Sequence, residues 1–417
     1  MRSVVLLTID ALRQDALGCY GNGLGLTPFI DSLAARSLVF TQAHAVAPYT
    51  QASFPGILTS SYYYDCPVSE HLSSQRTLVS EVLQAAGICT AAFHSNPYLC
   101  DYFGWNRGWH HFYDSMEDEV TALNPYAKGD AINRHLDDWL AGQAQGRDRD
   151  PLFLWVHYMD VHEPYVPDRR YLEAVDPSIR LSPQQMFDLF VNVVRPRDVS
   201  DPSTVRLLHQ LYLAHVREVD GYVRDLWHIL ERRGVLVDTT VIITSDHGDE
   251  FGEHGGLSHD GKMYSELVRV PLLIYRSGEQ TGQACHTVVS GLDISPTIVH
   301  LFGLEAVERF QGHSLLPLGQ HPRRGCYGEA LGKLTHRPKP TDRPAFYYRE
   351  GDLKIMYRAE EDRWEMYDLG SDPGEHRNII DTSPMAGEMK RKLQPRIDRV
   401  SVRSSTTCVG GTRDAKG

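Results

Sequence analysis

Cysteine is scarce in this chain, and the few that occur are not spaced as pairs. The 417 residues contain 7 Cys, an odd number, and none has the Cys-x-x-Cys spacing that is typical of zinc knuckles and redox motifs. Neither a disulfide framework nor a cysteine-based zinc site is indicated. Because reduced thiols are typical of the cytosol, we expect a cytoplasmic protein.

The chain also lacks an excess of positive charge and any long hydrophobic run. Its 42 Lys and Arg stand against 54 Asp and Glu, which gives a formal net charge of -12 at pH 7. This balance argues against binding to nucleic acid or to an anionic membrane surface. The apolar run in the opening MRSVVLLTID is too short for a signal peptide or a membrane span. We expect no membrane association, and no pattern indicates an oligomeric state.

Short β-type runs alternate with helical patterns through the first three quarters of the chain. The continuous apolar run at residues 3–9 is typical of a strand buried on both faces of a sheet. We expect further strands at residues 87–93, 152–157, 239–244 and 270–275, and helices at 28–37, 76–86, 129–142 and 205–233. This alternation predicts an α/β fold with a doubly wound, mixed or parallel sheet flanked by helices.

The pattern changes near residue 311 to short alternating segments such as AFYYREGDLKIMYR. These segments predict a small antiparallel sheet packed on the main domain. We therefore expect a catalytic α/β domain at residues 1–310, a C-terminal α+β subdomain at 311–385 and a C-terminal helix or flexible tail at 386–417.

Three of the expected strands end in polar clusters. These clusters are Asp10, the stretch from His157 to His162, and the stretch from Ser245 to Asp249. Ligands of open α/β sheets bind at the carboxyl ends of strands, so the three clusters should converge. An isolated Asp at such a position could instead cap the following turn.

The most informative segment is TSDHGDEFGEHGGLSHDGKMY at residues 244–264. Asp246 and His247 offer a carboxylate oxygen and an imidazole nitrogen, a combination that suits Zn²⁺ or Mn²⁺. The alternative is a capping Asp beside a core His. Thr50 precedes an apolar helical segment, where a hydroxyl caps the helix or acts as a nucleophile next to backbone N–H groups aimed at an anion.

Taken together, these segments resemble the sulfatase family of the alkaline phosphatase superfamily. The resemblance runs through nearly the whole chain in order, and the segments that carry it are TIDALRQDALGCYG, PYTQASFPGILTS, HYMDVHEPY, TSDHGDEFGEHG, GKMYSELVRVPLLIY, LDISPTIVHLFGL, QGHSLLPL and EMYDLGSDPGEHRN. It implies an alkaline-phosphatase-like fold and an ester hydrolase or transferase that requires a metal ion.

Residue by residue, the resemblance implies that Asp10, Asp246 and His247 bind the metal and that Thr50 is the nucleophile, with its oxygen on or near that metal. Sulfatases place at this position a Cys or Ser that matures to formylglycine, followed by an Arg where this chain has Phe54. Because Thr cannot form formylglycine, the set looks like that of phosphoethanolamine transferases and lipoteichoic acid synthases. That set implies one Zn²⁺ or Mn²⁺ rather than Mg²⁺ or Ca²⁺.

A second departure from the family is Ala11, which stands where many sulfatases place another metal-binding Asp. The loss of that negative charge disfavours octahedral Ca²⁺.

Cationic groups are needed to stabilise the charge that develops on a transferred group. The resemblance implies that His162, His259 and Lys262 act in catalysis and substrate binding, although His162 could cap a turn and Lys262 could be a solvated charge. Arg13 and His94 are weaker candidates for substrate binding, and Arg13 could instead tie loops together. A second metal could be held by Asp160, His162 and His259.

The leading hypothesis is a metal-dependent hydrolase or phosphotransferase that cleaves a small-molecule phosphate or phosphonate ester through a phospho-Thr50 intermediate. The first alternative is a sulfatase that works without formylglycine. The second is a non-catalytic binding protein on the same fold, which the missing Arg favours. The organic part of the substrate has no signature in the sequence.

Overall fold

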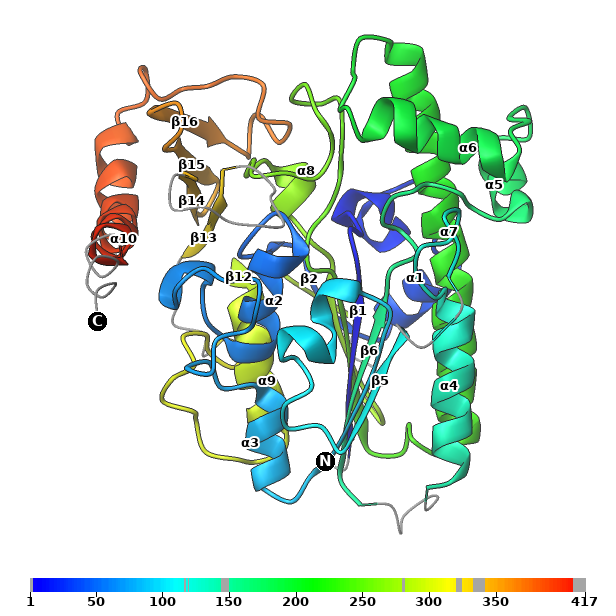
Figure 1. Cartoon of the computed structure of the whole chain (residues 1–417). Coiled ribbons are helices and arrows are strands. Elements are labelled where there is room, and N and C mark those ends of the chain that lie inside the picture. The colour runs from blue at the N-terminus through cyan, green and yellow to red at the C-terminus, as the bar shows by residue number, and fades with distance from the viewer. Residues whose placement is uncertain are drawn as a thin grey trace, which may run out of the picture.

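The central element of the computed structural model is an eight-stranded sheet with helices on both faces (Figure 1). Its strand order is β11-β2-β10-β7-β1-β6-β4-β5. The structure describes residues 3–115, 118, 120–143, 150–279, 282–319, 325–332 and 342–407. The expected α/β architecture is confirmed.

The middle of the sheet is parallel, and all of its residues except Cys89 are buried. Its strands are β1 (Ser3–Ile9), β4 (Cys89–His94), β6 (Leu152–Tyr158) and β7 (Thr239–Thr244). β1 pairs in parallel with β6 on one side and with β7 on the other. Because parallel neighbours end at the same edge, the residues that follow β1, β6 and β7 share one edge of the sheet.

The flanks of the sheet are short and partly antiparallel. β10 (Leu272–Arg276) runs antiparallel to β7. The remaining flanking strands, which the sequence pattern did not predict, are β2 (Leu38–Phe40), β5 (His111–Asp114) and β11 (Gln283–Cys285). The sheet is therefore mixed rather than purely parallel. Short two-stranded pairs are formed by β3 (Ala43–His44) with β12 (Val289–Ser290) and by β8 (Glu250–Phe251) with β9 (Leu257–Ser258).

Two hydrophobic cores lie on opposite faces of the sheet, because successive side chains of β1 point to opposite sides. Val4 and Leu6 pack into one core, and Val5 and Leu7 into the other. The first core is covered by α2 (Thr50–Thr59), α3 (Val79–Ala85) and α9 (Ile294–Leu301). The second is covered by α1 (Pro28–Ala34), α4 (Gly129–Ala141) and α7 (Pro202–Arg232), seen on the right of Figure 1.

A four-stranded antiparallel sheet lies beside the main sheet at one end of the molecule (Figure 1). It is formed by β13 (Gly325–Leu331), β14 (Pro344–Glu350), β15 (Leu353–Arg358) and β16 (Arg363–Asp368). The expected C-terminal antiparallel sheet is confirmed. α10 (Ala386–Thr407) covers it with an apolar stripe of Met389, Leu393, Ile397 and Val400. Residues 408–417 lie outside the described residues.

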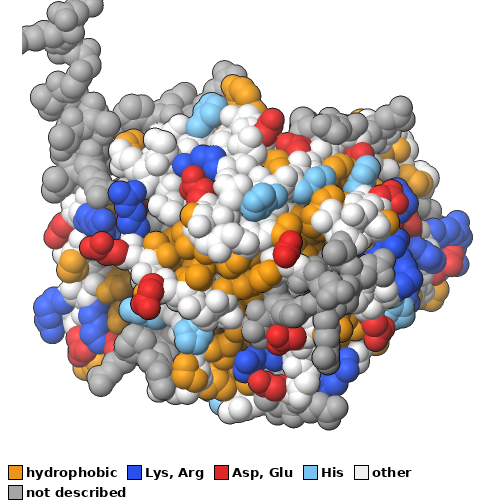
Figure 2. All heavy atoms as spheres, turned by 90° about the horizontal axis from the view of Figure 1, so that it is seen from below, with side chains coloured by type: hydrophobic (Ala, Val, Ile, Leu, Met, Phe, Trp, Pro, Cys, Tyr) orange, Lys and Arg blue, Asp and Glu red, His pale blue; other side chains and the backbone are white. Residues whose placement is uncertain are grey.

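Smaller helices complete the described chain, namely α5 (Arg169–Val175), α6 (Pro183–Leu189) and α8 (Ser265–Val268). Across the described residues, no helix combines the length and the apolarity that a membrane crossing requires. Seen from below (Figure 2), basic and acidic side chains are interspersed around the edge of the described surface, and apolar side chains gather across its middle.

Candidate active site

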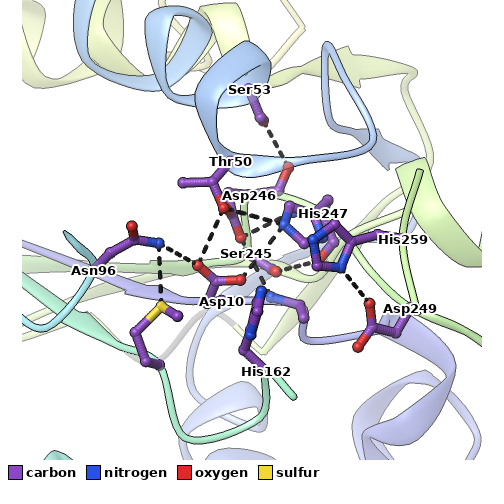
Figure 3. A network of polar contacts seen from close by, with 12 residues as sticks. Asp10, Thr50, Ser53, Asn96, His162, Ser245, Asp246, His247, Asp249 and His259 are labelled. Atoms are coloured by element: carbon purple, nitrogen blue, oxygen red, sulfur yellow. Dashed lines mark hydrogen bonds and ion pairs between the residues drawn. The ribbon is translucent and has the colours of Figure 1, made fainter. Parts of the chain in front are cut away.

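Four side chains from distant parts of the sequence meet at the carboxyl edge of the main sheet (Figure 3). Thr50 Oγ lies 3.3 Å from Asp10 Oδ2 and 3.3 Å from His247 Nε2. His247 Nε2 in turn lies 3.4 Å from Asp10 Oδ1 and 3.5 Å from Asp246 Oδ2. The structure thus brings together the four residues of the expected metal and nucleophile set.

The ends of the strands and the start of α2 position this cluster. Asp10 follows β1 directly, and Ala11 turns the chain with a positive φ of 56°. Thr50 is the first residue of α2, and the extended Tyr49 is its N-cap, so the Thr50 hydroxyl does not cap the helix. One turn later, Ser53 Oγ donates a hydrogen bond of 2.6 Å to the carbonyl oxygen of Asp246. This bond ties the start of α2 to the end of β7.

The cluster has the donor set and the charge of a cation site. His247 Nδ1 lies 2.9 Å from the carbonyl oxygen of Gly248, so Nδ1 carries the proton and the lone pair of Nε2 faces the two carboxylates. Asp10 Oδ1 and Asp246 Oδ2 are buried and have no hydrogen-bond partner among the residues that the structure describes. One ligand atom from each of Asp10, Asp246 and His247 falls within 4.8 Å of the others. Electron-rich atoms that face one another without a proton fit a divalent metal ion.

The ionisation of the two carboxylates supports the same conclusion. Burial alone would raise the pKa of Asp10, but His157 and the neighbouring imidazoles hold it below its usual value. Burial and the negative charge of Asp10 raise the pKa of Asp246. The ligand oxygens of the two buried carboxylates lie within 4.8 Å of each other. At this separation the two negative charges repel each other unless a cation lies between them.

Two further histidines face the cluster from the other side (Figure 3). His259 Nδ1 lies 2.8 Å from Asp249 Oδ1, and His162 Nδ1 lies 2.7 Å from the carbonyl oxygen of Glu163. The Nε2 atoms of both rings therefore remain available to a ligand. The His259 ring lies 4.4 Å from the His247 ring and 4.9 Å from the His162 ring, measured between centroids.

Nearby carboxylates raise the pKa of both histidines. Burial alone would lower the pKa of His259, but Glu163 and Asp249 raise it to about 9. Glu163 and Asp10 likewise raise the pKa of His162 against the effect of burial. The two rings thus lie near His247 and can each hold a proton there.

The expected second metal triad is not brought together. The Asp160 carboxylate accepts a hydrogen bond of 2.9 Å from the Gly129 backbone, and it shares no metal-sized group with the histidines among the described residues. His162, Glu163 and His259 form such a group instead. The sequence-based choice of Asp160 is therefore wrong, because its side chain bonds to the start of α4.

Three other candidates make no hydrogen bond or ion pair with the four clustered side chains in the described part of the chain, namely Lys262, Arg13 and His94. The Lys262 ammonium binds Glu250 Oε2 at 2.8 Å and the His254 carbonyl at 3.1 Å. The Arg13 guanidinium binds Asp15, Glu253 and the Asp249 carbonyl, so it ties loops together. His94 is fully buried and stacks on Trp155, and burial lowers its pKa to about 3. A neutral core imidazole of this kind is not an anion-binding group.

Asn96, which the sequence analysis did not single out, also joins the site, and so does His157 from the polar stretch His157 to His162. Asn96 Nδ2 donates a hydrogen bond of 2.8 Å to Asp10 Oδ2, and His157 Nε2 lies 3.5 Å from the same oxygen. Asn96 follows the end of β4, and this polar position after a strand is the one signal that could have identified it. Asp249 and Glu163 affect the site through His162 and His259, because they raise the pKa of both rings. Only the tertiary contacts of the two carboxylates reveal this role.

Comparisons with known proteins identify the family of this chain. A family model described as Sulfatase matches residues 2–304, and one described as N-sulphoglucosamine sulphohydrolase, C-terminal, matches residues 252–403. An N-acetylglucosamine-6-O-sulfatase of Bacteroides thetaiotaomicron is 24% identical, over 94% of this chain and 85% of its own length. An arylsulfatase of Clostridium perfringens is also 24% identical, over 91% of this chain and 90% of its own length.

Solved structures show the same fold. The phosphonate monoester hydrolase of Agrobacterium radiobacter has a TM-score of 0.77 and 19% sequence identity, and the match covers 97% of this chain and 96% of that one. A protein solved with D-glucosamine-2-N,6-O-disulfate as its substrate also has a TM-score of 0.77, at 20% identity, with 97% and 98% covered. Because one family model spans most of its length, this chain belongs to the sulfatase family of the alkaline phosphatase superfamily.

Proposed function

We propose that this protein hydrolyses a small-molecule phosphate or phosphonate ester through a covalent phospho-Thr50 intermediate. The observation that carries the proposal is the position of Thr50 Oγ, which lies 3.3 Å from both Asp10 Oδ2 and His247 Nε2. A Thr hydroxyl is a weak nucleophile unless a metal or a base activates it. A metal ion held by Asp10 and His247 would lie next to this oxygen.

Asp10, Asp246, His247 and the Thr50 hydroxyl would hold one divalent ion. The mixture of carboxylate oxygens and an imidazole nitrogen favours Zn²⁺ or Mn²⁺ over Ca²⁺. When bound, the ion would lower the pKa of the Thr50 hydroxyl and withdraw charge from the ester.

The protein's own groups account for the bonds and protons of the reaction. Thr50 Oγ attacks phosphorus, so that an Oγ–P bond forms while the bond to the leaving oxygen breaks. His162 or His259, each with its Nε2 directed at the site, donates a proton to that oxygen. The Thr50 proton passes to Asp10 Oδ2, 3.3 Å from Oγ, as the Oγ–P bond forms. A water molecule then attacks phosphorus and returns a proton to the histidine, while the Oγ–P bond breaks and Thr50 takes its proton back from Asp10.

Phosphorus is favoured over sulfur because of the nucleophile. Formylglycine can release sulfate by breaking down as a hemiacetal, whereas a sulfated Thr has no such route. A phosphorylated Thr is resolved by attack of water at phosphorus. The fold shared with phosphonate monoester hydrolase is compatible with phosphorus esters.

Sulfate ester hydrolysis is the second candidate, and the names of the relatives favour it. Those relatives include an N-acetylglucosamine-6-O-sulfatase, an arylsulfatase and, over 58% of this chain, a choline-sulfatase of Rhizobium meliloti. On this candidate, the same Thr50 would attack sulfur. The two candidates predict different products from matched esters.

The test compares wild type, Thr50→Ala and Thr50→Ser on p-nitrophenyl phosphate, phenylphosphonate and sulfate. Thr50→Ala should lose at least ~1,000-fold in kcat, whereas Thr50→Ser keeps the hydroxyl and should retain measurable turnover. The melting temperature of Thr50→Ala should remain close to that of wild type, because its hydroxyl caps no backbone group. Undiminished activity of Thr50→Ala would rule out Thr50 as the nucleophile. If wild type cleaves the sulfate ester faster than the phosphate and phosphonate esters, the second candidate is favoured.

A further inference from the structure

One arginine from another part of the chain binds the loop that carries His259. The pairing of β8 with β9 ends at Ser258, so His259 lies just beyond the paired strands. Ser258 has a positive φ of 61°, and the chain turns there. The Arg197 guanidinium donates a hydrogen bond of 2.7 Å to the His259 carbonyl oxygen and one of 3.2 Å to the Leu257 carbonyl oxygen. These two bonds hold the chain on both sides of the turn.

The same guanidinium also pairs with the residue that follows His259. Its Nη1 atom lies 3.4 Å from Asp260 Oδ2. Because both side chains are partly exposed, the ion pair by itself contributes little stability. A guanidinium is planar and presents its N–H groups in a rigid fork, so acceptors that bind the same fork are held in a fixed relation to one another. The effect of Arg197 is therefore to fix the shape of this loop.

The backbone that carries Arg197 is itself anchored. Arg197 follows α6 and a short π-helix at Phe190–Val194. Its N–H donates a hydrogen bond of 2.9 Å to the Val194 carbonyl oxygen, and Val194 is buried in the core that α7 covers. The φ of Arg197 is 58°, which is uncommon for a residue with a side chain and is found most often where function requires it. The arginine thus extends from a fixed turn.

A second set of contacts orients the ring of His259. Its Nδ1 atom faces Asp249 Oδ1, and the other oxygen of Asp249 accepts a hydrogen bond of 2.6 Å from Tyr165 OH. These bonds set the tilt of the ring, whereas Arg197 holds the main chain from which the ring extends. A proton donor must lie within hydrogen-bonding distance of the oxygen that it protonates. A displacement of about 1 Å can cost roughly 100-fold in rate.

We propose that Arg197 is a positioning residue that holds the loop of His259 so that this histidine donates the proton to the leaving oxygen. The inference rests on the proposed function, and it assigns the proton to His259 rather than to His162. The Nδ1 atom of His162 faces a backbone carbonyl, whereas that of His259 faces a carboxylate, which favours the protonated ring. Arg197 acts through His259 and binds no part of the substrate.

The test compares p-nitrophenyl phosphate with phenyl phosphate, which differ only in the nitro group of the leaving phenol. The nitro group stabilises the departing phenoxide, so phenyl phosphate depends far more on a proton donor. Arg197→Met removes the N–H groups and keeps the alkyl chain. It should lower kcat/KM for phenyl phosphate by ~10-fold or more, and that for p-nitrophenyl phosphate by ~3-fold at most. Arg197→Lys keeps a charged donor and should recover part of the loss.

The same comparison in a His259→Ala background tests whether Arg197 acts through the histidine. His259→Ala alone should lower kcat/KM for phenyl phosphate more than for p-nitrophenyl phosphate. Adding Arg197→Met should then change either value by less than ~2-fold, because the group that Arg197 positions is gone. Arg195→Met is the matched control. Arg195 lies two residues earlier, is exposed, and has its guanidinium 5.2 Å from the centre of the Phe190 ring, so its loss should leave the ratio between the esters unchanged.

The ratio between two esters is measured on one sample, so a partly unfolded variant does not distort it. If Arg197→Met does not fold, Arg197→Lys with and without His259→Ala decides. Three results overturn the inference: equal losses on both esters in Arg197→Met, a full effect of Arg197→Met in the His259→Ala background, or a His259→Ala that keeps the wild-type ratio. Failure of wild type to cleave either ester would instead contradict the proposed function.

Discussion

Phe54 shows how one residue changes the chemistry that this site can perform. It stands where the resemblance to sulfatases places an Arg, and its side chain is fully buried. Its ring lies 5.1 Å from the His157 ring and 5.7 Å from the Trp155 ring. No cation is therefore present at this position, and the negative charge of the substrate must be met by the metal site and the two facing histidines.

Asp160 is a second residue whose environment sets its chemistry, in this case its protonation. It is buried, and burial together with the nearby Glu218 raises its pKa to about 8. In the unfolded chain an Asp titrates near 3.9. From about pH 4 to about pH 8 the unfolded state is thus ionised while the folded state keeps the proton. The contribution of Asp160 to stability is full below pH 4 and is lost as the pH rises, by at most about 1.4 kcal/mol per pH unit.

Asp160→Asn should remove this slope, because Asn is neutral at every pH and its side-chain oxygen can still accept the bond from Gly129. The free energy of unfolding of the variant, relative to wild type, should be higher by a few kcal/mol near pH 7.5 than near pH 5. Urea unfolding at both pH values measures this difference. Asp188→Asn, at an exposed position, is the control and should show no such difference. An Asp160→Asn variant with the same relative stability at both pH values would contradict the account.

At the scale of the elements, α2 combines a reactive end with a packed body. Thr50 and Ser53 face the strand ends, whereas Phe54, Ile57 and Leu58 are buried in one hydrophobic core. A helix anchored in this way holds its first residue in a fixed position. The placement of Thr50 should therefore depend on the packing of Phe54 in the next turn.

Phe54→Ala should lower the free energy of unfolding by ~3–5 kcal/mol, because it leaves a cavity among aromatic side chains. Phe54→Leu fills much of the same volume and should cost less. Guanidinium unfolding measures both. A change of less than about 1 kcal/mol in Phe54→Ala would show that the aromatic cluster does not stabilise α2 as described.

Elements with a strong pattern were predictable from the sequence, and short or edge elements were not. Residues 3–9 and 239–244 coincide with β1 and β7, because strands buried on both faces are continuous apolar runs. β2 and β11 have three residues each, too few to show a period. Their existence depends on the neighbours with which they pair.

The same distinction holds for the site. Asp10, Asp246 and His247 follow buried strands, so local sequence together with the resemblance was sufficient to bring them together. The side chains of Lys262 and Asp160 bind Glu250 and the Gly129 backbone instead of the cluster around Thr50. Neither contact has a signature at the level of sequence spacing.

At the scale of the whole molecule, the C-terminal sheet is joined to the loop that carries His259. Glu375 Oε1 binds Lys354 at 2.8 Å, with both side chains fully buried, and Glu375 Oε2 accepts a bond from the Ser265 backbone. Tyr264 OH lies 3.1 Å from Glu365 of β16. The C-terminal sheet thus supports one wall of the active site, although it contributes none of the four residues that meet there, which are Asp10, Thr50, Asp246 and His247.

The metal site should contribute to the stability of the whole fold. Without a cation, the buried carboxylates of Asp10 and Asp246 face each other and the lone pair of His247 Nε2. An ion that binds the folded state alone should raise the free energy of unfolding by about 2.7 kcal/mol at a free concentration a hundred times its Kd. Thermal unfolding after chelation should show a lower melting temperature, which Zn²⁺ or Mn²⁺ restores more effectively than Ca²⁺. Asp246→Asn should bind the ion less tightly, and rescue by Ca²⁺ alone would contradict the ligand assignment.

The central claim is that Thr50 carries the transferred group during turnover. The most direct measurement is accurate-mass peptide analysis of enzyme that is quenched with acid during turnover of p-nitrophenyl phosphate. The account predicts a phosphoryl group on Thr50 that is absent in Thr50→Ala and disappears once the substrate is consumed. A phosphoryl group on another residue, or full turnover by Thr50→Ala, would contradict it.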